Sequence, residues 1–216
     1  MVKKLWIVAL FFIPLGQVWA GINASLGYEL FMSGAGERYL ESWLLLEGKS
    51  LEYVKNEEGK FQATIQVLVL ATQNGEIKAY DKYVLESQSY NETEQELGDL
   101  FDVHRLPLNQ GTYQIEWIIQ DLNAKDSSKI QHIDSLWVTQ GEGPSLSGIM
   151  LIESLQPFAG NNPRLKRGDL ELMPRIQSYV FPEEEVLKFY VEAWDTEQFL
   201  GANTGFALRG QIKHSD

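Results

Sequence analysis

The sequence predicts an all-β protein, and three observations support this. Short runs rich in Val, Ile, Tyr and Trp alternate with turn residues through most of the chain. In residues 61–71 every odd position is apolar, whereas Gln62, Thr64 and Gln66 are polar. This period of two is typical of a half-buried strand. Asn74-Gly75 then predicts a type I′ hairpin turn, because both central residues of that turn need positive φ.

The first twenty residues, 1–20, predict a secretory signal helix. Lys3 and Lys4 form a positive start, residues 5–15 are apolar, and Val18-Trp19-Ala20 precede a cleavage site before Gly21. The apolar run has about eleven residues, whereas a spanning helix needs about twenty. A retained membrane anchor is the alternative. We expect export to the periplasm or cell surface, with no stable membrane span after cleavage.

Residues 21–37 are read as a Gly- and Ser-containing lead-in, and residues 38–140 as a β-sandwich of immunoglobulin-like type. Tyr113 follows the Gly111 turn and resembles the tyrosine corner of such sandwiches, in which the phenol bonds to upstream backbone. Trp117, on the same strand face, is the expected core tryptophan. The acidic segment 90–97 is read as a loop. The predicted strands lie near residues 39–46, 50–55, 60–72, 76–87, 99–105, 112–121 and 129–139.

Residues 141–147 concentrate Gly, Pro and Ser and predict a linker. Residues 148–216 then predict a second β-rich unit that is smaller or incomplete, because its strands are too few for a closed sandwich. A truncated module is one explanation of such a unit. The last strand, near 206–212, is expected at a free edge, where a partner or a second copy can add a strand. The expected strands are near 149–155, 170–173, 175–181, 186–194 and 206–212.

The charge and composition exclude several classes of function. The formal charge is −12, and loss of the two lysines of the signal takes it to −14, which disfavours nucleic acid as a partner. The chain has no cysteine, so it has no disulfide, thiol nucleophile, cysteine metal site or lipid-modified cysteine. The exported protein must therefore be held together by packing alone.

No recognised catalytic signature is present, and we expect a non-enzymatic protein without a cofactor. The three histidines are widely separated and do not have zinc-ligand spacing. Asp121, Asn123 and Asp126 resemble part of an oxygen-ligand calcium loop, but the glycine and the bidentate glutamate of an EF-hand loop are missing. An Asx-stabilised turn explains the same residues.

Three tryptophans leave two interpretations open. Trp43, Trp137 and Trp194 are either core residues or members of a strip that binds sugars or peptides. The second interpretation, combined with nearby acids, describes a carbohydrate-active or hydrolytic accessory protein. Burial of the tryptophans would argue against it.

Six stretches of the chain carry a resemblance to a known family. They are Tyr39-Leu40-Glu41, Leu51-Glu52-Tyr53, Asn56 through Gly59-Lys60-Phe61-Gln62-Ala63, Asp81-Lys82-Tyr83, Arg105-Leu106-Pro107-Leu108 with Gly111 and Tyr113, and Asp121-Leu122-Asn123. Together they resemble the N-terminal region of exported proteins from the Bacteroidetes and allied bacteria that carry a GWxTD motif. This chain contains no Gly-Trp-x-Thr-Asp sequence. The resemblance therefore implies only the β-rich front half of such proteins, and it implies no activity.

Together these observations predict an exported binding or scaffolding module of the bacterial cell envelope. Its partner is expected to be a protein or envelope component, contacted through strand edges or loops, and homo-oligomers fit the same expectation. The accessory protein described above is one alternative. A structural spacer, whose acidic surface only keeps it soluble, is the other.

Overall fold

The computed structural model describes residues 21–92, 96–125, 128–139, 143–160, 162–176 and 186–211. The predicted signal therefore lies outside the described residues. The described chain is mostly β-strand, arranged in antiparallel sheets, with one short helix, which confirms the all-β prediction. None of its helices has the length and apolar character needed to cross a membrane.

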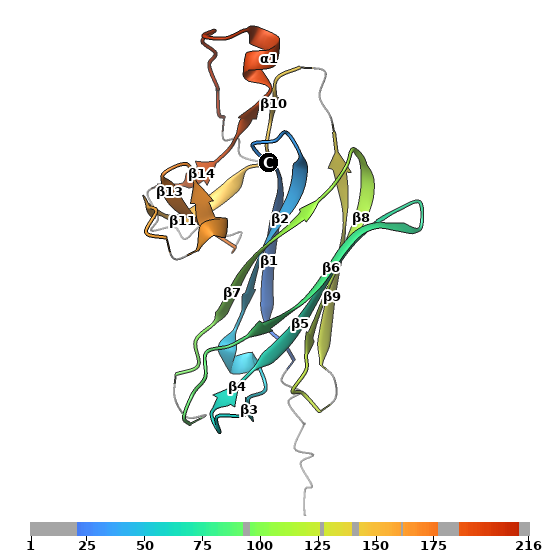
Figure 1. The fold of residues 1–216 in the computed structure, drawn as a ribbon, viewed down its shortest axis with the longest axis vertical. Helices are drawn as coiled ribbons and strands as arrows, with labels where there is room; N and C mark the ends of the chain where they lie inside the picture. The colour runs from blue at the N-terminus through green and yellow to red at the C-terminus, as the bar shows by residue number, and fades with distance from the viewer. Residues whose placement is uncertain are drawn as a thin grey trace, which may run out of the picture.

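Two long antiparallel sheets lie face to face along the long axis of the molecule (Figure 1). A short hairpin of β3 (Val54–Lys55) and β4 (Phe61–Gln62) lies at their lower end. Sheet I has the order β1 (Ala24–Met32), β2 (Arg38–Leu46), β7 (Leu100–Pro107). Sheet II has the order β6 (Glu76–Glu86), β5 (Thr64–Gln73), β8 (Gly111–Asp121), β9 (Lys129–Val138).

The alternation read from the sequence places the core between these two sheets. The odd positions of β5, from Ile65 to Ala71, are buried, and so are the apolar odd positions of β8. They pack against Leu40, Leu44 and Leu46 of β2. The predicted hairpin turn is confirmed, because Asn74 and Gly75 have φ of 54° and 80° between the paired residues Gln73 and Glu76. Each large apolar side chain buried here contributes about 1.5–3 kcal/mol.

Strand β1 lies within the segment read as a lead-in, so that interpretation is wrong for residues 24–32. Its even positions, such as Leu26 and Leu30, pack against the core between the sheets. Gly27 obscures the pattern, but it has a packing role: it lies opposite Trp43, whose ring would be only 3.1 Å from a Cβ at this position. Conversely, the strand expected at 50–55 is reduced to Val54–Lys55, preceded by the 3₁₀ turn η1 (Gly48–Ser50).

The described residues from 143 to 211 form what we call the C-terminal layer, and part of this layer packs against sheet I (Figure 1). Sheet III of this layer has the order β12 (Lys166–Arg167), β13 (Leu170–Pro174), β11 (Met150–Pro157), β14 (Lys188–Tyr190). A small pair joins β10 (Ser145–Leu146) to β15 (Ala193–Trp194). The 3₁₀ turn η2 (Pro163–Leu165) and the helix α1 (Thr196–Leu200) complete the layer.

The C-terminal layer shares its core with sheet I. Phe31, Trp43 and Val103, on the outer face of sheet I, pack in one cluster with residues of the layer. Sheet I is consequently covered on both faces, and the layer rests on side chains supplied by the front of the chain. The layer's members of the cluster are Met150, Ile152, Leu165, Leu172 and Trp194.

Three expectations for the layer need correction. Residues 206–211 form no strand, although their alternation predicts one. The strand expected at 186–194 is divided into β14 and β15, and α1 was not anticipated. A strand needs a partner as well as a pattern, because its backbone groups are satisfied by a neighbour. Most of the strand expected at 175–181 lies outside the described residues, and so do residues 141–142 of the predicted linker. Residues 145–146 of that linker form β10.

Candidate functional site

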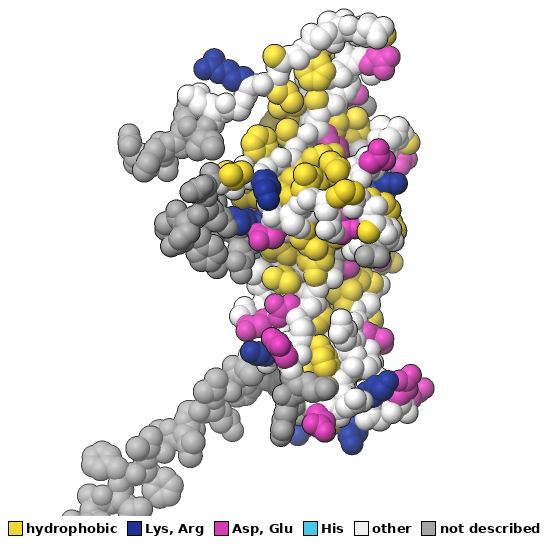
Figure 2. Space-filling view, turned by 90° about the vertical axis from the view of Figure 1, so that its left-hand side faces the viewer, with side chains coloured by type: hydrophobic (Ala, Val, Ile, Leu, Met, Phe, Trp, Pro, Cys, Tyr) yellow, Lys and Arg dark blue, Asp and Glu magenta, His cyan; other side chains and the backbone are white. Residues whose placement is uncertain are grey.

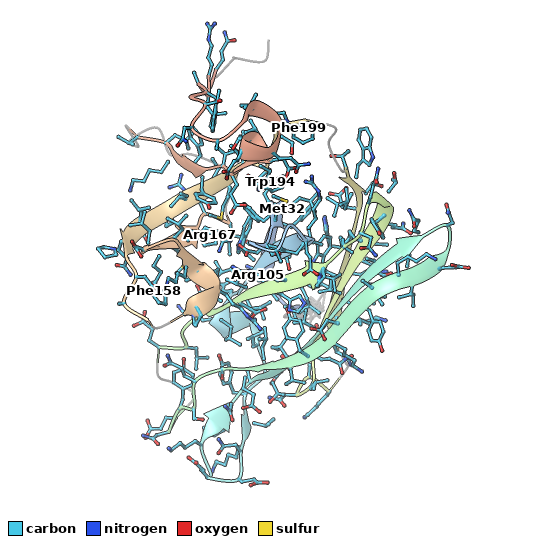
Figure 3. The ribbon with its side chains drawn as sticks, turned by 45° about the horizontal axis from the view of Figure 1, so that its top comes forward. Met32, Arg105, Phe158, Arg167, Trp194 and Phe199 are labelled. Carbon is cyan, nitrogen blue, oxygen red and sulfur yellow. The ribbon has the colours of Figure 1, made fainter. Side chains whose placement is uncertain are left out.

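A buried ionic cluster joins the C-terminal layer to sheet I. Glu41 on β2 lies directly opposite Arg105 on β7, and Arg105 Nε donates to Glu41 Oε2 at 2.6 Å. Arg167 of β12 donates from the layer to Glu41 Oε1, also at 2.6 Å. Trp43 Nε1 donates to the same oxygen at 3.1 Å. Figure 3 shows Arg105 and Arg167 where the layer meets sheet I.

Aromatic rings enclose the two guanidinium groups of this cluster. The Arg167 guanidinium lies 5.2 Å from the centroid of the Phe31 ring, and that of Arg105 lies 5.2 Å from the centroid of the Tyr39 ring. Burial opposes the charge of Arg167, but the Glu41 carboxylate more than offsets this and raises the pKa of Arg167. The Glu41 carboxylate has three donors and almost no exposed surface, which fits a structural contact between layers.

A further set of polar contacts surrounds Trp194 and Glu192, where the layer meets sheet I. The indole Nε1 of Trp194 donates to Glu192 Oε2 at 2.9 Å, and the Tyr190 hydroxyl donates to Glu192 Oε1 at 2.9 Å. Burial, and then the hydrogen bond to Glu192, raise the pKa of Tyr190. The Arg38 guanidinium lies 4.8 Å from the Trp194 ring centroid. The two hydrogen bonds lie within the layer, and the Arg38–Trp194 contact joins β15 to β2 of sheet I.

A second polar cluster closes the side where β6 and β7 meet. The rings of His104 and Tyr83 are stacked with centroids 4.6 Å apart, and the Tyr83 hydroxyl donates to Asp102 Oδ2 at 2.8 Å. His104 Nε2 lies 3.4 Å from Asp81 Oδ2, without hydrogen-bond geometry. Burial lowers the pKa of His104, against the opposing effect of Asp81. A neutral His104 therefore belongs to the packing of this edge.

Asp121 and Asn123, two of the three candidate calcium ligands, hold loops together. Asp121 Oδ2 accepts the Glu52 amide at 2.8 Å, and Asp121 Oδ1 accepts the Asn123 amide at 2.9 Å. The Asn123 side chain donates to the Glu52 and Gln62 carbonyls. Asp126 lies outside the described residues. In the part of the chain that is described, no group of three or more His, Asp or Glu side chains is placed to hold a metal ion.

The two structural residues singled out in the sequence lie in the core between the sheets. The buried Tyr113 donates its hydroxyl to the Asn109 carbonyl at 3.1 Å, four residues upstream. Trp117 is buried, and its ring stacks on Tyr28 with a centroid distance of 4.9 Å. The Tyr28 hydroxyl in turn donates to Asp134 of β9. This contact links β1 to β9 on the side opposite the His104 cluster.

The three tryptophans left open by the sequence do not form a strip. Trp43 and Trp194 are only 4% and 6% exposed and belong to the core shared by the layer and sheet I. Trp137 on β9 is 72% exposed. A binding strip of these residues would need neighbouring exposed rings, so the structure does not support the carbohydrate-active alternative.

Exposed apolar side chains are concentrated on the C-terminal layer. Eleven of the eighteen large exposed apolar side chains of the described residues belong to it, although it holds only about half as many described residues as the front of the chain. Figure 2 shows apolar side chains gathered across this side of the molecule. A large uncovered apolar surface typically marks an interaction site. The eleven are Leu146, Ile149, Leu155, Leu170, Val186, Leu187, Phe189, Phe199, Leu200, Phe206 and Leu208.

A polar cavity of about 720 Å³ lies near η1. It is bordered by Asn23, Lys49, Tyr90 and Asp99. Several of its polar groups already have partners: Asp99 Oδ1 accepts the Gly48 amide at 3.0 Å, and the Tyr90 hydroxyl accepts the Gly98 amide at 2.8 Å. These polar groups therefore have a structural role in holding the segments around η1 together.

Sequence reasoning missed Glu41, Arg105 and Arg167 as a set. A signal was present, because both faces of β2 are largely apolar and a glutamate within such a strand requires a buried cation. Comparisons with protein families, curated proteins and solved structures find no match to this chain.

Proposed function

We propose that this chain is an exported, non-enzymatic binding or scaffolding module of the bacterial cell envelope. The predicted signal supports export, and the absence of cysteine fits a protein that relies on packing. We further infer that sheets I and II are an immunoglobulin-like sandwich. Their strand number and the Tyr113 hydrogen bond to upstream backbone support this relationship.

The observation that carries the proposal is the uncovered apolar surface of the C-terminal layer. The layer covers sheet I with part of its surface, and it leaves Ile149, Leu155 and Phe189 exposed. Burial of apolar surface is the main favourable contribution to protein association. Glu41 and Asp121 are engaged in internal hydrogen bonds, and His104 is stacked on Tyr83, so recognition by surface is favoured over chemistry at a cleft.

Export can be tested by expressing the full chain in a bacterial host and fractionating the cells. We expect the protein in the periplasm or at the surface, with a mature N-terminus at Gly21 measured by mass spectrometry. A chain that keeps residues 1–20 in the cytoplasm would contradict the proposal.

Binding can be tested with a photo-crosslinking amino acid placed at Ile149 or Leu155, with Tyr80 of sheet II as the matched exposed control. In cells of the natural host, we expect the two layer positions to give the same discrete envelope product and the Tyr80 position to give none. If all three positions give no product, the spacer alternative replaces the proposed function.

A further inference from the structure

We propose that residues 206–211 form a strand that adds to the free edge of β14 in a second copy of this chain. This deepens the proposed function, on which it rests, by naming one partner of the C-terminal layer. The proposal brings together two features of the layer: an unpaired segment with the pattern of a strand, and a sheet edge with uncovered apolar side chains.

The donor segment has strand alternation but pairs with no strand among the described residues of its own chain. Phe206 and Leu208 alternate with Ala207 and Arg209, and every residue from 201 to 211 is exposed. Phe206 is 51% exposed and Leu208 is 55% exposed. Gly201 and Asn203, both with positive φ, turn the chain after α1.

The acceptor is β14, the last strand of sheet III. Among the described residues it pairs with β11 alone, through Met150–Tyr190, Leu151–Phe189 and Ile152–Lys188. Tyr190 packs into the core shared with sheet I, whereas Phe189 is 54% exposed. One face of β14 is therefore packed on the core through Tyr190, and its other face carries the exposed apolar side chain of Phe189. It is continuous with the interface that already joins the layer to sheet I.

An antiparallel register makes the two segments complementary. With Phe206 opposite Phe189, Leu208 lies opposite Leu187, and both pairs share one face of the extended sheet. Ala207 then lies opposite Lys188, so the two basic residues Lys188 and Arg209 are not directly paired. The added strand covers apolar side chains of both segments and satisfies backbone groups of both.

A second copy is the favoured occupant because one chain carries both halves of the contact. Reciprocal exchange between two copies repeats the same contact twice around a two-fold axis and leaves neither segment unpaired.

Engineered cysteines test the contact directly, because the natural chain has none. One purified full-length preparation carries Lys188→Cys and a second carries Ala207→Cys, both at exposed positions. Residues opposite each other in an antiparallel pair have Cα atoms about 4.5–5.5 Å apart, within the range that a disulfide spans. After mixing under mild oxidation, we expect a 188–207 disulfide between chains, identified by peptide mass spectrometry.

The control replaces Ala207→Cys with Ala202→Cys, which is exposed on the same tail but outside the donor segment. The 188–207 bond should form about tenfold faster than the 188–202 bond, because strand pairing raises the local concentration of the thiols. Equal rates would overturn the proposal. A single chain carrying both Lys188→Cys and Ala207→Cys that forms only an internal disulfide would also overturn it, and would show pairing within one copy.

Light scattering on the cysteine-free protein gives an independent measurement. We expect a concentration-dependent dimer that Leu208→Glu converts to monomer, whereas Ala202→Glu, which adds the same charge at an exposed position outside the donor segment, leaves it dimeric. A cysteine-free protein that is monomeric at every concentration overturns the exchange. That result leaves the proposed function standing, since envelope crosslinks from Ile149 and Leu155 do not depend on a second copy.

Discussion

The front of the chain, residues 21–139, and the C-terminal layer are both β-structures, but they use their apolar residues differently. The front encloses a core between sheets I and II and closes its two sides with Tyr28–Asp134 and Tyr83–Asp102 hydrogen bonds. The layer buries one face on sheet I and leaves most of the exposed large apolar side chains on the rest of its surface. The front resembles a completed fold, and the layer resembles one that needs a neighbour.

The attachments of the layer are also of a different kind. Within the front, the core depends mainly on apolar packing, whereas the layer is joined to sheet I by apolar packing together with a buried carboxylate and two guanidinium groups. Such a cluster is costly to desolvate, and it is most damaging when one member is lost. The stability of the layer should therefore depend strongly on single residues.

The largest effect is expected from Arg167→Met. Removal of this guanidinium leaves Glu41 buried with less compensation, which should cost about 3–5 kcal/mol of unfolding free energy. Urea denaturation followed by tryptophan fluorescence measures it. The triple variant Glu41→Met, Arg105→Met and Arg167→Met, which removes all three charges, should recover most of the loss. A single variant as stable as the parent would show that the cluster does not hold the layer.

Matched leucine truncations in the two cores should separate the two regions. Leu46→Ala in the front core and Leu172→Ala in the shared core should each cost about 2–5 kcal/mol, since both side chains are fully buried. We expect Leu46→Ala to increase hydrogen exchange throughout the protein, and Leu172→Ala to increase it mainly in β11 and β13. Uniform exchange in both variants would mean that the layer and the front unfold as one unit.

Two glycine-to-alanine substitutions compare how closely atoms pack in the front and in the C-terminal layer. A Cβ at Gly48 would overlap the Gly98 carbonyl, so Gly48→Ala should cost about 1–3 kcal/mol. Gly205 in the layer has no neighbouring atom near the position of a Cβ, so Gly205→Ala should change stability by less than about 0.5 kcal/mol. Thermal denaturation measures both, and a tolerated Gly48→Ala would contradict close packing at η1.

The smallest expected effect is a pH dependence confined to the front. Burial lowers the pKa of His104 in the folded protein below the value of about 6.5 that it has when unfolded. The unfolded chain then binds the proton more readily than the folded one. The contribution of neutral, buried His104 to the unfolding free energy is therefore complete above about pH 6.5 and decreases as the pH falls below it. Urea midpoints from pH 7.5 to 5 should show this decrease, and His104→Gln should remove that part of it. If the urea midpoint of the variant fell with pH as steeply as that of the parent, His104 would not be the group responsible.

Much of the front could be predicted because its signals are local. Strands β5 and β8 have strict alternation, and the Asn74-Gly75 turn depends on φ values that those two residues favour. The Tyr113 hydrogen bond spans only four residues. Strand β1 was missed because Gly27 interrupts its pattern, and the reason for that glycine is the Trp43 ring on the neighbouring strand.

The sequence by itself determined the all-β class and the face that β5 and β8 turn to the core, because a period of two records burial on one side. Only the tertiary structure decided the role of Glu41, whose partner Arg167 is 126 residues away. It also decided that the patterned segment 206–211 pairs with no strand among the described residues. Alternation states which side chains of a strand face the same way, but pairing depends on an edge supplied by another part of the fold.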